Sequence, residues 1–429
     1  MHAVARNVDA NPSLAFVSSC AVLLAILGYV FPAFTMVGSV PIYWLSILSS
    51  LVLVLFFCLR VSIFGRIRHS NTKLDLLVQL YILWALLGFF LNFLVNSITA
   101  NADHQLAQIQ SLAGFLLVLP HYYFGRFFDS FGFSFSKFKS YLVASFFLVC
   151  CSALVYILSS ESLYQAREII GQRFPLLVVF WAWFFGGIWL ITRQKRYFLV
   201  FLLGTLICIL SLTRAAYLQW VACAIAMFFA VGARNMLKVT AYVAVMMTVV
   251  TSIAYSFYDS IVSTVTERLT DYLFYVDFAE GPYSPSDRFQ VWAGIGRYLI
   301  ENPLTLIVGY GQMGPSGFSL DFIDTYGEWI QSTNAHSQYL DTVVRMGIPG
   351  LVIELCINFV AVFVTLFRRG DPAYLKIVAA CLVGHLVYGV FHESVRWQVF
   401  GMVFWFFIGI IARHSEKRHI PKSAKFEEA

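Results

Sequence analysis

The chain has 429 residues, of which 59% are hydrophobic and only 12% are charged, and its mean hydropathy is +0.75. The charged share is about half that of a soluble globular domain. This composition excludes a soluble enzyme, a disordered protein and a typical nucleic-acid-binding protein. It predicts a polytopic membrane protein whose partner is the lipid bilayer, with no nucleic acid bound.

Apolar stretches long enough to cross a bilayer recur along the chain, since a spanning helix needs roughly 20 apolar residues. Lipid leaves no backbone polar group without a partner, and barrel strands would alternate apolar and polar residues. The predicted fold class is therefore all-α, a polytopic membrane helix bundle of about 12 transmembrane helices. The stretches lie at 13–35, 42–59, 75–98, 107–127, 140–159, 174–192, 197–212, 215–232, 238–257, 347–367, 373–391 and 397–412.

The distribution of basic residues predicts the orientation. With the N-terminus in the cytoplasm, 21 of the 29 basic residues fall in the inside segments, and all lysines are among them. This bias predicts that both termini are cytoplasmic. The predicted organisation is helices 1–9 over residues 1–257, a periplasmic loop with amphipathic helices over 258–346, helices 10–12 over 347–412, and a cytoplasmic basic tail over 413–429.

The long outer loop contains a predicted amphipathic helix. Residues 287–300 place apolar side chains at helical spacing, with Pro303 ending the helix. Arg288 falls in the first turn, where free backbone N–H groups also favour an anion. The loop also contains Gly309-Tyr-Gly-Gln-Met-Gly314, which matches a dinucleotide-binding pattern. We reject that interpretation because no βαβ unit surrounds the motif, and we expect a tight or flexible loop near the membrane surface.

Two further residues on the predicted outer face carry chemistry. Arg214 lies between two apolar runs with almost no connecting loop, and a charge so near hydrocarbon needs a partner or a wet cavity. Snorkelling to the interface is the alternative. His336 leads into the tenth span, and histidine is the side chain best suited to take a proton near neutral pH. Gln338 and Asp341 are near enough in sequence to orient it.

Two ionisable residues fall inside predicted spans at matching depth, namely Glu354 and His385. We expect a paired structural contact between them, with a proton relay as the alternative. In the last outer loop, His392, Glu393 and Arg396 are expected to line the same cavity. The eight cysteines form no CxxC pair, so neither a metal cluster nor a disulfide framework is predicted.

At these residues the chain resembles the O-antigen ligase family, which includes O-antigen and exopolysaccharide polymerases. The resemblance is carried by Thr213-Arg-Ala, by Asp287-Arg288 leading the amphipathic helix, and by Asn334-Ala-His336 before Gly347-Ile-Pro-Gly350. The order of these motifs and the long loop also fit. Ser337 departs from the family, which often has asparagine directly after the histidine, and this puts an amide role at that position in doubt.

The resemblance implies a GT-C-like membrane glycosyltransferase in a bacterial inner membrane, with its active site facing the periplasm. The donor would be a glycan on undecaprenyl diphosphate, transferred with inversion and without metal or cofactor. By position, Arg214 and Arg288 would hold the diphosphate and His336 would activate the acceptor hydroxyl. The residues expected to bind substrate are Asn334, Gln338, Asp341, Arg345 and Arg396.

Three functions remain open from the sequence. The first is ligation of O-antigen onto lipid A–core in lipopolysaccharide biosynthesis. The second is polymerisation, in which a lipid-linked glycan is the acceptor. The third is a polysaccharide transporter or flippase, which the span count suits. The sequence shows no repeat between its halves, however, and its polar residues gather at one surface, so chemistry at the outer surface is favoured.

Overall fold

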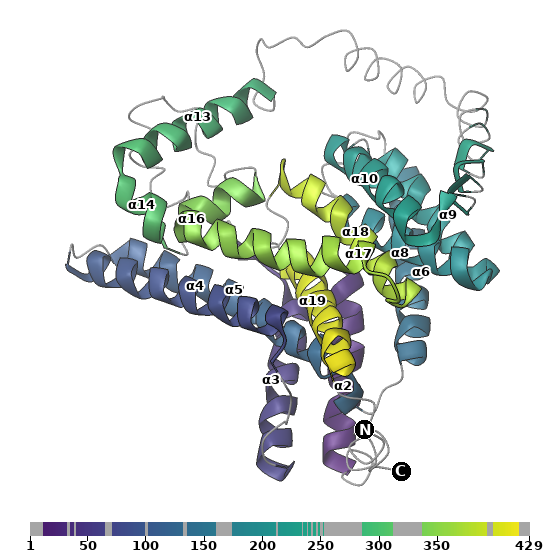
Figure 1. Ribbon diagram of the computed structural model, residues 1–429, viewed down its shortest axis with the longest axis horizontal. Helices are drawn as coiled ribbons and strands as arrows, with labels where there is room; N and C mark the ends of the chain where they lie inside the picture. The colour runs from purple at the N-terminus through teal and green to yellow at the C-terminus, as the bar shows by residue number, and fades with distance from the viewer. Residues whose placement is uncertain are drawn as a thin grey trace.

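The computed structural model describes residues 12–31, 35–37, 40–64, 71–98, 102–131, 135–159, 174–211, 213–233, 285–311, 337–392 and 398–419, with parts of 235–252. These residues are almost entirely helical, which confirms the predicted all-α class in its general form (Figure 1). One small addition is an antiparallel hairpin that pairs β1 (Thr35–Val37) with β2 (Val40–Ile42).

The helices of the first half follow the predicted stretches closely, with one difference at the first of them. The stretch predicted to run to residue 35 ends as a helix at Val30, because the chain enters the β1–β2 hairpin instead. The elements are α2 (Pro12–Val30), α3 (Trp44–Phe64), α4 (Lys73–Ile98), α5 (Ala102–Arg126), η1 (Phe128–Phe131), α6 (Phe135–Ser159), α8 (Phe174–Thr192), α9 (Lys195–Leu210) and α10 (Arg214–Val231).

The second half combines shorter loop helices with further apolar ones. Its last helix continues past the end of the predicted span, so part of the predicted tail is helical. The elements are α13 (Pro285–Glu301), α14 (Pro303–Val308), α16 (Gln338–Asn358), the π-helical η4 (Phe359–Val364), α17 (Thr365–Phe367), α18 (Ala373–Gly389) and α19 (Gln398–His419).

Within the described residues, seven helices are long and apolar enough to cross a membrane, and two shorter apolar helices lie at Leu14–Val30 and Ala373–Gly389. The protein is therefore a multi-pass membrane protein. The predicted stretches at 107–127 and 197–212 form α5 and α9, which are not among these nine, and 238–257 lies mostly outside the described residues. The number of twelve spans thus stays a prediction.

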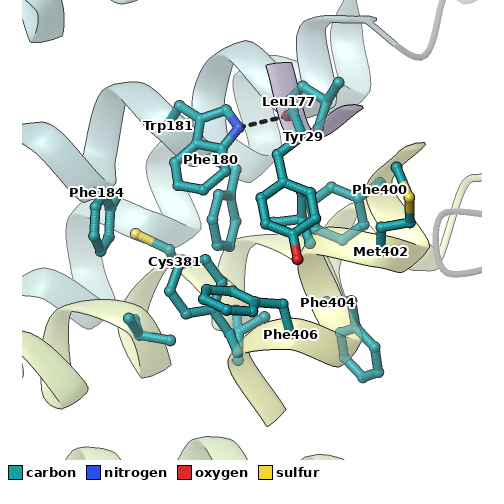
Figure 2. Packing of buried hydrophobic residues seen from close by; sticks show 14 of the residues in the cluster. Tyr29, Leu177, Phe180, Trp181, Phe184, Cys381, Phe400, Met402, Phe404 and Phe406 are labelled. Atoms are coloured by element: carbon teal, nitrogen blue, oxygen red, sulfur yellow. Dashed lines mark hydrogen bonds between the residues drawn. The ribbon is translucent and has the colours of Figure 1, made fainter. Parts of the chain in front are cut away.

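The core is centred on α8, whose side chains are apolar on every face and buried along nearly the whole helix. A helix that is apolar all round must be covered by neighbours or by lipid, and here α9, α10 and α18 cover it. Figure 2 shows its aromatic residues packed against α19, including Phe180 against Phe400 at a ring distance of 5.5 Å. The indole nitrogen of Trp181 donates to the Tyr29 carbonyl at 3.0 Å, which ties α2 to α8.

A close approach of two backbones joins α5 to α19. A Cβ atom on Gly125 would lie 2.0 Å from the Phe406 carbonyl oxygen, and one on Gly409 would lie 2.1 Å from the Tyr122 carbonyl oxygen. Membrane helices associate through such small residues. Lipid tails are as apolar as the helices, so the hydrophobic effect does not drive association and close van der Waals packing between the helices does. The last apolar helix is thereby fixed against the first half of the chain.

Ion pairs gather the predicted cytoplasmic segments at one end of the bundle. The central residue is Arg126 at the end of α5, whose side chain is 1% exposed. The tyrosine hydroxyl of Tyr122 also donates to Asp75 in this network. The pairs are Arg126 with Asp75 and Glu416, Arg413 with Asp129, and His414 with Asp371. Three of the segments that the basic-residue rule assigns to one side, 126–139, 368–376 and the segment after 411, are therefore joined in space.

Replacing Arg126 with leucine is expected to destabilise the folded protein by about 3–5 kcal/mol, because it leaves the Asp75 carboxylate buried without its cation. The measurement is thermal unfolding of the purified protein in detergent. Replacing Arg413 with leucine serves as the control, since its partner Asp129 is 50% exposed and such pairs contribute about 0–1 kcal/mol. Equal losses in the two variants would contradict a special role for the buried network.

Candidate functional site

The predicted catalytic residues are described to different extents. Arg214 is the first residue of α10, and its side chain is exposed. Arg288 is the fourth residue of α13, where the structure describes the helix but not this side chain. His336 lies outside the described residues, as do Asn334 and Arg396. The meeting of Arg214, Arg288 and His336 in one pocket therefore stays a prediction.

The amphipathic helix predicted at 287–300 is confirmed as α13, and it ends just before Pro303 as expected. Its buried residues Ile295 and Leu299 form a small apolar cluster with Val344 of α16. Leu340 packs against the same cluster. The helix that begins beside Arg288 is thus docked on the segment that follows His336 in the chain.

The helix α16 is divided into two arms by Gly347, whose backbone angles (φ 69°, ψ −177°) are not helical. The first arm covers residues 338–346, and the second continues from residue 348 into η4. Non-glycine residues essentially never adopt these angles. A Cβ atom on Gly347 would also lie 2.3 Å from the Ile307 carbonyl oxygen, because α14 packs directly on the break (Figure 1).

The loop at Gly309–Gly311 is a tight joint against this break, as expected from the sequence. The backbone N–H of Tyr310 donates to the Val344 carbonyl at 2.6 Å. Amide side chains from two other helices complete it: Asn92 of α4 donates to the Gly309 carbonyl at 3.3 Å, and Gln108 of α5 donates to the Tyr310 carbonyl at 3.0 Å. The glycine motif therefore holds the loop to the bundle.

The remaining predicted substrate-binding residues lie on the first arm of α16. Arg345 donates through Nε to both carboxylate oxygens of Asp341 at 2.8 Å, and Asp341 is completely buried. Gln338 is 2% exposed, and its amide nitrogen donates to Thr342 and Glu354. These contacts give the three residues a part in holding the arm, while their binding of substrate stays a prediction.

The contact expected between Glu354 and His385 is not seen among the described residues. His385 on α18 packs its ring against Phe400 and Phe404 of α19 at centroid distances of 4.6 and 5.2 Å. Its Nδ1 atom has no hydrogen-bond partner there. Glu354 instead accepts hydrogen bonds from the first arm of α16 and from Tyr81 of α4. The two side chains are turned toward different neighbours, so the expected pairing is wrong.

An apolar groove runs along the second arm of α16 and η4. It has a volume of about 400 Å³ and begins at Tyr339, whose hydroxyl donates to the Leu386 carbonyl at 2.8 Å and so bridges α16 to α18. The walls are apolar and largely exposed, as expected of a lipid-facing surface. They include Val352, Leu355, Phe359, Phe363 and Leu386.

Sequence reasoning assigned no role to Tyr81 or Thr342, which hold this region together. Thr342 follows Gln338 by four residues, so its position on the same helical face was available from the sequence. Tyr81 lies in α4, more than 250 residues earlier, and nothing local marks it among the other aromatic residues. Only the packing of α4 on α16 brings its hydroxyl to Glu354.

The fold defines a class: a multi-pass helical membrane protein in which a loop helix and a broken helix meet. Comparison then gives a similarity, because residues 199–355 match the family model described as O-antigen ligase. The match confirms the resemblance predicted from the sequence. It includes Arg214, Arg288, His336 and the first arm of α16, whereas Arg396 falls outside it. No curated protein matches the chain.

Proposed function

We propose that the protein is a membrane glycosyltransferase that moves a glycan from an undecaprenyl-diphosphate donor to an acceptor saccharide at the periplasmic face. Ligation of O-antigen to lipid A–core is the first choice. The observation that carries the proposal is the O-antigen ligase match over residues 199–355, the segment in which α13 docks on the arm that follows His336. The helix that carries Arg288 thus contacts the first arm of α16, and the approach of Arg214 to them is part of the proposal.

The proposed glycosyl transfer uses three side chains, those of His336, Arg214 and Arg288. His336 takes the proton of the acceptor hydroxyl as its oxygen attacks the anomeric carbon from the back. The bond from that carbon to the diphosphate oxygen breaks, and the leaving diphosphate gains negative charge. Arg214 and Arg288 stabilise that charge with bidentate hydrogen bonds, without a metal or another cofactor. Attack from the back inverts the anomeric centre.

The location of Arg214 supports its assigned role. It opens α10, and both the free N–H groups of a helix's first turn and a guanidinium favour an anion such as diphosphate. The apolar groove that begins at Tyr339, three residues after His336 in the chain, offers a place for a hydrocarbon chain. A polar head and a lipid tail are the two parts of the proposed donor.

The test is a transfer assay with the purified protein and a lipid-linked glycan donor. Lipid A–core and a second lipid-linked glycan are offered in turn as acceptor. Transfer to lipid A–core supports ligation, and elongation of the lipid-linked glycan supports polymerisation. Transfer to neither acceptor would contradict the proposal. We expect full activity in the presence of a chelator, and strict dependence on Mg²⁺ would count against the mechanism.

Replacing Arg214 with lysine is expected to reduce kcat/KM by about 10- to 100-fold, because a point charge cannot reproduce the planar fork on a diphosphate. Initial rates at varied donor concentration measure the change. Arg297 of α13 gives the matched control, since it is an exposed outer arginine without an assigned role and its lysine variant should keep full activity. Wild-type activity of the Arg214 variant would reduce this residue to an interfacial anchor.

A further inference from the structure

The buried carboxylate of Glu354 joins the two arms of α16. Glu354 lies in the second arm, seven residues after Gly347, and is 5% exposed. An ionisable side chain at such a position in an apolar span is costly unless polar neighbours satisfy it, and such residues are functional candidates by default. The transfer chemistry described above does not use Glu354.

Three donors from two elements converge on this carboxylate. The Thr342 hydroxyl donates to one oxygen at 2.6 Å, and the Gln338 amide donates to the other at 3.3 Å. The Tyr81 hydroxyl of α4 donates at 3.4 Å to the oxygen that Thr342 also contacts. Gln338 and Thr342 are four residues apart on one face of the first arm. Glu354 therefore holds that face to the second arm and to α4.

The contact is a direct consequence of the break at Gly347. In a straight helix, residues 338 and 354 would lie about 24 Å apart along the axis. Their side chains are hydrogen-bonded instead, so the first arm folds back along the second. Without a bond between the arms, the break alone would leave their angle free to vary.

The rest of the first arm is fixed by other means. Trp84 of α4 donates to the Met346 carbonyl at 2.7 Å beside the break, and Val344 packs under α13. At the other end, the Ser337 hydroxyl accepts from the Leu340 N–H at 3.5 Å and caps the arm. Compared with the contacts of Trp84 and Val344, the Gln338–Glu354 hydrogen bond lies closer to this capped end of the arm.

We propose that Glu354 is a positioning residue of the transfer reaction. By clamping the first arm of α16, it fixes the point at which the chain leaves His336 for the helix. This inference rests on the proposed function, because it takes His336 as the base. The role is one of placement, since Glu354 is not assigned any contact with the substrate.

The test is Glu354→Gln in the full-length protein, which keeps the shape of the side chain but removes its charge and one acceptor oxygen. We expect kcat to fall about 100-fold, the size of effect that follows a shift of about 1 Å at a reacting group, with the KM for the donor nearly unchanged. Thr342→Val and Tyr81→Phe each remove one hydroxyl and should lower kcat less than Glu354→Gln does. The effect of Thr342→Val should be the larger of the two, because its hydrogen bond to Glu354 is shorter. The pair of Thr342→Val with Glu354→Gln should be clearly less than additive.

A remote buried hydrogen bond supplies the control for general destabilisation. The Tyr29 hydroxyl bonds to His121 at 2.8 Å between α2 and α5, away from α16. Tyr29→Phe should lower the unfolding temperature but leave kcat unchanged. A kcat of Glu354→Gln equal to that of the native protein would overturn the inference. An equal loss of kcat in Glu354→Gln and Tyr29→Phe would also overturn it. Full activity of a His336→Ala variant would instead overturn the proposed function, so the two failures are distinguishable.

Discussion

A His336→Ala variant is expected to lose transfer activity by about 100- to 10,000-fold, because a sugar hydroxyl is a poor nucleophile and the variant has no positioned base. Binding of the lipid-linked donor and insertion into the membrane should be retained, since alanine removes no diphosphate contact. The measurement is kcat under saturating donor, together with donor affinity measured separately.

His414 provides a matched histidine control. It lies in α19 at the end of the bundle where the ion pairs gather, with Nε2 3.7 Å from Asp371. His414→Ala should keep full transfer activity. Normal transfer by His336→Ala would remove this residue from the role of base, and an equal loss in both variants would indicate general damage to the protein.

Replacing Gly347 with alanine is expected to have a large structural effect. The added Cβ atom would meet the Ile307 carbonyl oxygen at 2.3 Å, and the backbone angles alone cost an alanine about 1–3 kcal/mol. Relief requires α14 to move away from the break or the two arms to straighten. Straightening of the arms would separate Glu354 from Thr342, so activity should then fall along with stability.

The measurements are the yield of folded protein, its unfolding temperature and its transfer rate. Gly296 of α13 is the control, because nothing lies within 4 Å of the position that its Cβ would occupy and the site is an ordinary helical one. Gly296→Ala should leave stability unchanged or raise it slightly. A Gly347→Ala variant that folds and transfers like the native protein would show that the break is not required.

Much of the architecture could be predicted because the relevant signals are local. Continuous apolar runs place α3, α4, α8 and α10 to within a few residues. The periodic apolar residues of 287–300 predict α13. The predicted start of the tenth span at 347 coincides with the break at Gly347, although α16 itself begins earlier, at Gln338. The hairpin after Val30 was missed, because its residues are as apolar as those of a span.

The contacts of the predicted site residues could be predicted only in part. Asp341 and Arg345 were expected to bind substrate, and their spacing of four residues already permits the ion pair that the structure contains. Glu354 was expected to meet His385, because the two residues have the same predicted depth. The expectation was wrong, because depth along a span does not determine which way a side chain turns. Packing of α18 on α19 directs His385 toward two phenylalanines instead.

The sequence by itself determined that this protein is a multi-pass helical membrane protein that resembles the O-antigen ligase family, since composition, hydrophobic run length and short motifs are properties of the chain alone. Only the tertiary structure decided that α16 folds back at Gly347, that Glu354 bonds its two arms, and that α13 rests on the first of them. The physical reason is that these contacts join residues far apart in the chain. Their partners, such as Tyr81 and the Ile307 carbonyl, are selected by how the helices pack and not by any local pattern.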